Sequence, residues 1–146
     1  MATLSQINAK IGAYKGKIDE CEIMKENAEE DYEKLREFKI KVQNSQSAFE
    51  GSNNKKIKAL EKVRSISKYN NIAKQYYLSM QDSLTYTGLR LIGSVYSFLL
   101  RKINDELQQI SRKIEEYQDG IDSYNKRIKY YEKEYEKEKE KLEEEA

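Results

Sequence analysis

The side chains that could do chemistry in this chain are few in kind. It contains no His and a single Cys, Cys21, so a His-dependent general base, a catalytic triad and a typical zinc site are excluded. Asp and Glu are plentiful, but they lie among Lys and Arg, as on solvated helix faces. Cys21 falls in an apolar series, where a small buried residue is expected rather than a reactive thiol. We therefore expect no catalytic, metal-binding or cofactor-binding site, and no enzyme.

The overall charge does not indicate nucleic-acid binding. The chain has 27 Lys and Arg and 26 Asp and Glu, with a net charge of +1, whereas a nucleic-acid-binding chain usually carries a basic stripe. The strongest local basic cluster consists of Lys55, Lys56, Lys58, Lys62, Arg64 and Lys68. We interpret this cluster as a polar helix face and expect no nucleic acid as partner. A coiled coil that associates with DNA or RNA through the cluster is an alternative.

Three apolar series determine the predicted elements. Apolar residues recur in alternating steps of three and four, which is the seam of a heptad repeat. The first series starts at Leu4 and predicts a helix over 4–44, the second starts at Ile57 and predicts a helix over 55–87, and the third predicts a helix over 95–142.

Two interruptions separate these series. The stretch SQSAFEGSNN, residues 45–54, predicts a turn, because Ser, Asn and Gly compete with helical hydrogen bonds and Gly51 can adopt a positive φ. Asn53 or Asn54 would then cap the next helix. Residues 87–94 contain two glycines and predict a kink or a second turn.

The chain is therefore expected to be all-α, a single domain over 1–146 built as an elongated antiparallel helical hairpin or bundle of about three long coiled-coil helices. Pro is absent, and Lys, Glu, Gln and Arg fill the polar positions at little cost to a helix. Narrow apolar stripes cannot form a deep core, so the helices must pair with one another or with another chain. The segment 89–100 is apolar on too many sides for a contact between only two helices.

The third series also provides the predicted partner-binding residues. Its tyrosines carry hydroxyl groups that need water or a partner when buried, which suits a shared, partly wet interface. The residues predicted to bind a partner helix are Leu107, Ile110, Ile114, Tyr117, Ile121 and Tyr124. A self-contained antiparallel bundle with its hydroxyls at the edges explains the same pattern equally well.

No apolar run reaches the 18 or so residues that a membrane span needs, so we expect no direct membrane insertion. The N-terminus MATLSQINAK lacks the charged start and apolar middle of a signal peptide. We expect a cytoplasmic protein, with secretion by a route that needs no cleaved leader as the alternative.

The pattern resembles a known family. A long N-terminal helix, a turn with the aromatic-x-Gly motif Phe49-Glu50-Gly51 and a return helix are similar to the WXG superfamily of type VII secretion substrates and partners, with Phe where Trp is most frequent. The long C-terminal helix resembles most the YwqH-like branch, helical proteins encoded beside LXG toxins. Type VII substrates carry a Y-x-x-x-D/E signal near the last helix, and Tyr130 with Glu134 fits that pattern.

The resemblance implies a non-enzymatic adaptor. Such a protein would bind the helical N-terminal region of an LXG-type toxin and help to present it to the type VII secretion system. Further small helical proteins or a second copy of the chain are additional partners to expect. The alternative is a self-assembling structural coiled-coil scaffold whose apolar seams are covered by its own copies.

Overall fold

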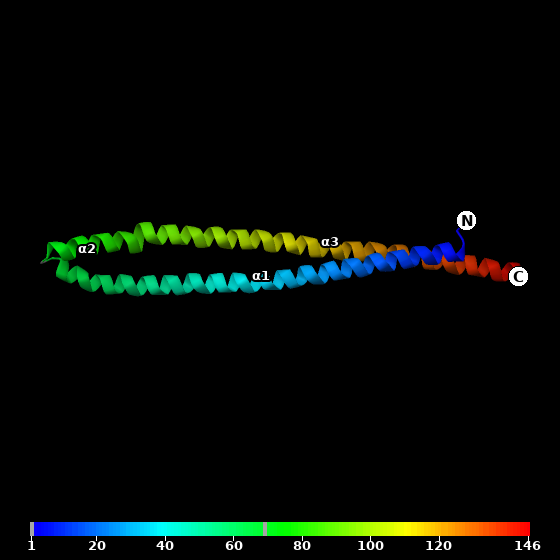
Figure 1. Ribbon diagram of the computed structural model, residues 1–146, viewed down its shortest axis with the longest axis horizontal. Coiled ribbons are helices and arrows are strands. Elements are labelled where there is room, and N and C mark those ends of the chain that lie inside the picture. Colours follow the sequence, from blue (N-terminus) through cyan, green and yellow to red (C-terminus); the bar gives the residue numbers. More distant parts are fainter. Residues whose placement is uncertain (1, 69) are drawn as a thin grey trace. The chain divides into compact units, whose positions relative to one another are not determined.

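The computed structural model describes residues 2–68 and 70–146, with the side chains at positions 66, 67, 86 and 87 outside the description. Its elements are the α-helices α1 (Leu4–Ser67), α2 (Asn71–Gln81) and α3 (Thr87–Glu145), and the π-helical segment η1 (Asp82–Tyr86) (Figure 1). The prediction of an all-helical chain is confirmed. The count differs, because α2, η1 and α3 follow one another without a break and form one bent helix after α1.

A capping box starts α1. The Thr3 backbone N–H donates to Gln6 Oε1 at 3.0 Å, and the Gln6 N–H donates to Thr3 Oγ1 at 3.2 Å. This exchange satisfies two backbone donors that the first turn of a helix leaves without internal partners. The sequence Thr-x-x-Gln therefore fixes where the first helix begins.

The predicted turn at 45–54 is wrong, because α1 continues through it. No residue in the described part of the chain has a positive φ, Gly51 included. The reason lies in the seam, which keeps its steps of four and three from Val42 through Gln46, Phe49 and Asn53. These inward positions pack on the returning helix, and this packing outweighs the cost of about 1 kcal/mol for one helical glycine. The motif Phe49-Glu50-Gly51 therefore lies within a helix.

We predict that Gly51→Ala will raise the free energy of unfolding by up to about 1 kcal/mol, because Ala loses less backbone entropy in a helix. A Cβ at this position meets nothing within 4 Å. Urea denaturation of both proteins measures the difference. A turn with positive φ at Gly51 would give the opposite sign, so a loss of stability in the variant would contradict the helix.

Asn53 is buried rather than placed at a helix terminus. Its exposed fraction is 5%, and its Nδ2 donates to the Leu84 carbonyl oxygen in η1 at 2.9 Å. The predicted role of Asn53 or Asn54 as a helix cap is therefore wrong. A buried amide needs its hydrogen bonds satisfied, and Asn53 meets this need by binding the backbone where the second helix departs from α geometry.

The chain reverses between the end of α1 at Ser67 and the start of α2 at Asn71, within the range where the helix 55–87 was predicted. Asn70 caps α2, since its Oδ1 accepts from the backbone N–H groups of Ile72 at 2.8 Å and Ala73 at 3.4 Å. Asn is among the preferred residues at this position. Tyr69, part of the predicted apolar series, lies outside the described residues.

The kink predicted at 87–94 is wrong, because the structure shows regular α-helix there. The departure from α geometry comes earlier in the chain. It lies in η1, where Thr85 Oγ1 donates to the Gln81 carbonyl oxygen. Just beyond it, a Cβ at Gly88 would overlap the carbonyl oxygen of Ser83, five residues earlier. A glycine is therefore required here by the close approach of the backbone.

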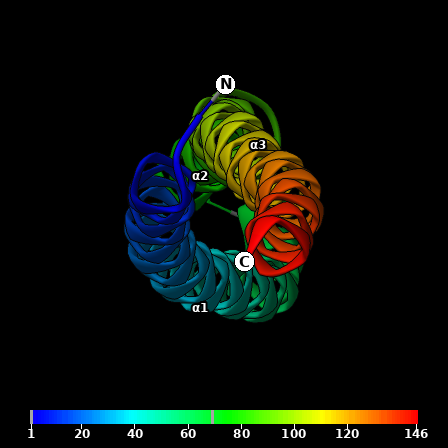
Figure 2. The same cartoon turned by 90° about the vertical axis from the view of Figure 1, so that its right-hand side faces the viewer.

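The chain was predicted to be one domain, and by its internal contacts it divides into two compact units. Unit 1 comprises residues 1–33 and 107–146, and unit 2 comprises residues 34–106. In unit 1 the start of α1 and the end of α3 are two separate helices (Figure 2). Tyr14 contacts Tyr131 while Lys25 Nζ donates to Gln118 Oε1 at 2.7 Å, so the two segments run antiparallel.

In unit 2 the second half of α1 pairs with α2, η1 and the start of α3. The Phe49 and Tyr96 ring centroids are 6.4 Å apart, and Asn53 contacts Leu84 further along, so this pairing is also antiparallel. Ser45 Oγ and Tyr96 Oη form a hydrogen bond of 2.8 Å. Buried apolar residues of unit 2 are Val42, Leu60 and Ile103.

Candidate partner-binding surfaces

The six predicted partner-binding residues lie in unit 1. Leu107 and Ile121 are buried, and Ile110, Ile114, Tyr117 and Tyr124 are half-buried. Ile121 belongs to a cluster with Ile18 and Ile128, against which Ile11, Tyr14, Cys21 and Tyr124 pack. The structure thus uses this seam inside the chain. Its buried members, Leu107 and Ile121, would meet a partner only if the two helical segments of unit 1 separated.

The tyrosines of unit 1 contact one another. The Tyr14 ring lies 5.8 Å from Tyr124 and 5.9 Å from Tyr131, measured between ring centroids. Lys17 Nζ lies 5.6 Å from the Tyr14 and Tyr124 rings, and Arg127 donates to the Tyr14 hydroxyl at 3.4 Å. Aromatic stacking and cation–π contacts of this kind stabilise the pair of helices. For Tyr14, Tyr124 and Tyr131, contacts inside unit 1 therefore explain why tyrosines occur in the apolar series.

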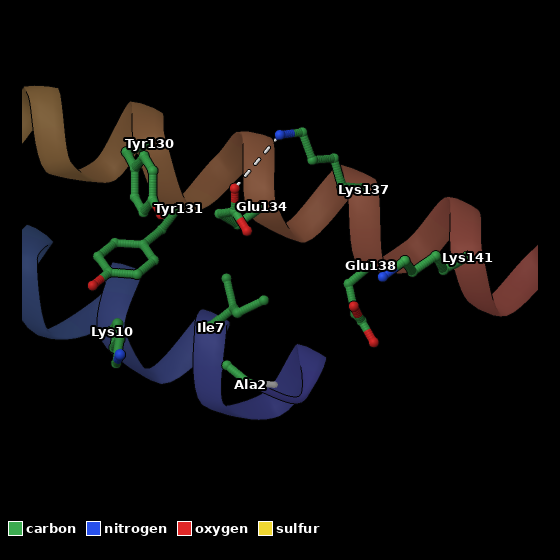
Figure 3. A pocket seen from close by; sticks show the side chains of 9 residues that line it. All are labelled: Ala2, Ile7, Lys10, Tyr130, Tyr131, Glu134, Lys137, Glu138 and Lys141. Atoms are coloured by element: carbon green, nitrogen blue, oxygen red, sulfur yellow. Dashed lines mark ion pairs between the residues drawn. The ribbon is translucent and has the colours of Figure 1, made fainter.

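Tyr130 and Glu134, which match the secretion-signal pattern, line one pocket of about 350 Å³ in unit 1 (Figure 3). Tyr130 is 59% exposed and lies edge-on to Tyr131. Glu134 forms an ion pair of 3.7 Å with Lys137. The lining residues are Ala2, Ile7, Lys10, Tyr130, Tyr131, Glu134, Lys137, Glu138 and Lys141. Both residues of the pattern are therefore presented at one accessible place on α3.

Cys21 is half-buried in unit 1, and a Cβ built at Gly120 would lie 3.6 Å from its Sγ, so the thiol packs over the glycine of the opposite helix. Within residues 2–68 and 70–146, no group of three or more His, Cys, Asp or Glu is placed to hold a metal ion. Among the described residues, no helix combines the length and apolar character needed to cross a membrane.

The exposed apolar side chains are concentrated in unit 2. Leu91, Val95 and Phe98, spaced i, i+4 and i+7, lie on one face of α3 and are 67%, 60% and 59% exposed. Further large apolar residues exposed in unit 2 are Phe38, Ile40, Ile72, Tyr76, Leu78 and Leu89. The segment 89–100 thus has the second apolar side that its sequence indicated, and in the chain alone that side faces solvent. We call Leu91, Val95 and Phe98 the outer face of α3.

No protein-family model, curated protein or solved structure matches this chain.

Charge is divided unequally between the two units. Unit 2 contains 14 Lys and Arg against 6 Asp and Glu, whereas unit 1 contains 13 Lys and Arg against 20 Asp and Glu. The net charge of +1 conceals this division, because the two excesses nearly cancel. A count over the whole chain does not reveal the division, whereas a sliding count of charge along the sequence does. Electrostatics therefore favour an acidic partner for unit 2 and a basic partner for unit 1.

Proposed function

We propose that this chain is a non-enzymatic helical adaptor, which binds the helical N-terminal region of an LXG-type toxin and helps to present it to the type VII secretion system. The observation that carries the proposal is the outer face of α3, Leu91, Val95 and Phe98, which the chain leaves exposed. Monomeric soluble proteins rarely expose contiguous large apolar patches, and such patches mark interaction sites.

A partner helix fits the spacing of this face. Residues at i, i+4 and i+7 form a straight stripe along a helix, which matches the apolar stripe of a second amphipathic helix. Each large side chain that becomes fully buried contributes about 1.5–3 kcal/mol. Three of them contribute at most about 9 kcal/mol, which is comparable to the roughly 4–15 kcal/mol that association costs, so a specific complex needs further contacts.

A second apolar feature of unit 2 supports the same mode of binding. A hollow of about 210 Å³ is lined mainly by apolar side chains of α1, α2 and η1. Its lining residues are Lys56, Ala59, Leu60, Val63, Tyr76, Met80 and Leu84. A hollow of this size accepts one large apolar side chain, which is how a helix anchors itself in a partner.

The proposed link to type VII secretion depends on the family resemblance, and the structure removes one of the features on which that resemblance was based. Phe49-Glu50-Gly51 no longer marks a turn, so the resemblance depends on two long amphipathic helices and the C-terminal tyrosine pattern. In this proposal, unit 2 binds the toxin, and the exposed Tyr130 and the half-buried Glu134 in unit 1 are read by the secretion machinery. The two activities would use different parts of the chain.

Affinity purification of the tagged chain from its native host tests the proposal. We expect a larger, toxin-like protein to co-elute in near-stoichiometric amount and to be lost from the double variant Leu91→Asp/Phe98→Asp. The matched control is Ser111→Asp/Asn125→Asp, which adds the same charges at exposed polar positions of α3 and should retain the partner.

Circular dichroism must show that both double variants remain helical. Recovery of the chain only with itself, or a partner that binds the Leu91→Asp/Phe98→Asp variant as tightly as the wild type, would contradict the adaptor. The first of these outcomes would favour the self-assembling scaffold instead.

A further inference from the structure

Unit 1 contains an acidic helical segment with an exposed apolar centre. Residues 19–33 of α1 include eight Asp and Glu and one Lys. Ile23 and Met24 within it are 60% and 51% exposed, on the sides of α1 that face away from the cluster around Ile18. The helical neighbours of Ile23 at i−4, i−3, i+3 and i+7 are Asp19, Glu20, Glu26 and Glu30, all exposed. We call Ile23, Met24 and these four carboxylates the acidic face of α1.

The outer face of α3 has the opposite charge at its border. Residues 83–104 contain no Asp or Glu. Arg101 and Lys102 follow Phe98 at i+3 and i+4, and Lys102 Nζ lies 5.5 Å from the Phe98 ring. The two surfaces are therefore complementary, since each has exposed apolar residues at its centre and charges of one sign around or beside them.

We propose that the acidic face of α1 in one copy of the chain binds the outer face of α3 in a second copy. Ile23 and Phe98 are both about 60% exposed, so each face is open to a partner. The partner of the outer face of α3 is a second copy of the chain, because the acidic face of α1 has the apolar centre and the charge that match this outer face.

The apolar residues and the charged residues of such a contact have different roles. Burial of Ile23 and Met24 against Leu91, Val95 and Phe98 supplies affinity. The carboxylates around Ile23, facing Arg101 and Lys102, set the orientation and disfavour pairing of like faces. Exposed charges are screened over about 8–10 Å at 0.1–0.15 M salt, so the association should weaken as salt rises.

This inference stands apart from the adaptor function, because it concerns the purified chain without any partner. The toxin helix and the second copy would use the same outer face of α3, so they would exclude each other. Self-association would then keep this apolar face from water until the toxin displaces the second copy.

Sedimentation velocity of the full-length purified chain at low and high salt tests the proposal. We expect dimers at low salt and a shift to monomers at high salt. The variants Glu26→Lys/Glu30→Lys and Arg101→Glu/Lys102→Glu should each raise the dimer Kd by about tenfold or more. An equimolar mixture of these two variants should associate again, because each supplies the charge that the other has lost.

The matched control is Glu143→Lys/Glu144→Lys, which reverses two exposed charges near the end of α3 and should leave the dimer Kd unchanged. Circular dichroism verifies that every variant stays helical. A chain that is monomeric at all salt concentrations would overturn the proposal. So would dimers that both reversals leave intact, or a mixture of the two reversed variants that fails to associate. None of these results bears on toxin binding, which is measured separately in the native host.

Discussion

Replacing Ile121 by Asp is expected to abolish the pairing of helices in unit 1. Ile121 is 7% exposed and lies in the cluster with Ile18 and Ile128. The substitution removes a buried apolar side chain and places a charge in its position, at a cost of about 3–5 kcal/mol. This is a large fraction of the stability of a small domain. Thermal unfolding followed by circular dichroism should show a strongly lowered Tm or the loss of cooperative unfolding.

The matched control for this prediction is Leu142→Asp. It replaces an exposed apolar side chain of the same unit by the same charged residue, so it should change the free energy of unfolding by no more than about 0.5 kcal/mol. Equal losses of stability in the two variants would mean that Ile121 does not belong to a buried core.

Replacing Gly88 by Ala is expected to cost about 1–3 kcal/mol, because the new Cβ overlaps the Ser83 carbonyl oxygen and the backbone must move. Gly93→Ala is the matched control, since a Cβ at Gly93 meets nothing within 4 Å and should stabilise the helix by up to about 1 kcal/mol. Urea denaturation gives both values. A gain of stability in both variants would show that the chain has no π-helical segment before Gly88.

The seam could be read from the sequence because its period is set by helix geometry alone. Ile7, Ile18, Ile103, Ile121 and Ile128 were placed on seams, and the structure buries all five. Steps of three and four keep side chains on one side of a helix whatever lies opposite. For the same reason, the all-helical fold followed from the sequence.

The position of the reversal could not be predicted from composition. Gly51 and the asparagines beside it have low helix propensity, but propensity differences of about 1 kcal/mol are overridden by packing such as that of Phe49 on Tyr96. The steps of four and three continue unbroken through Gln46, Phe49 and Asn53. This continuity indicated better than composition that the helix goes on. The true reversal is marked by Asn70, whose role as an N-cap depends on where the preceding helix stops.

The candidate surfaces were predictable only in part. The excess of apolar residues in 89–100 was visible, and the structure shows that the side formed by Leu91, Val95 and Phe98 is exposed. Of the six residues predicted to bind a partner, Leu107 and Ile121 are buried and Tyr124 packs on the core cluster of unit 1. The sequence could not reveal this, because a seam looks the same whether the helix opposite belongs to the same chain or to another. That distinction requires the pairing of the helices, which a periodic pattern does not specify.

The most direct test of the adaptor function is site-specific photo-crosslinking in the native host. A photoreactive phenylalanine analogue at position 98 would replace the exposed Phe98 with little change in shape, and the same analogue at the exposed position 111 is the control. We predict a covalent adduct between position 98 and a larger helical toxin-like protein, and none from position 111. An adduct from position 98 that contains only two copies of this chain, or no adduct at all, would contradict the adaptor function.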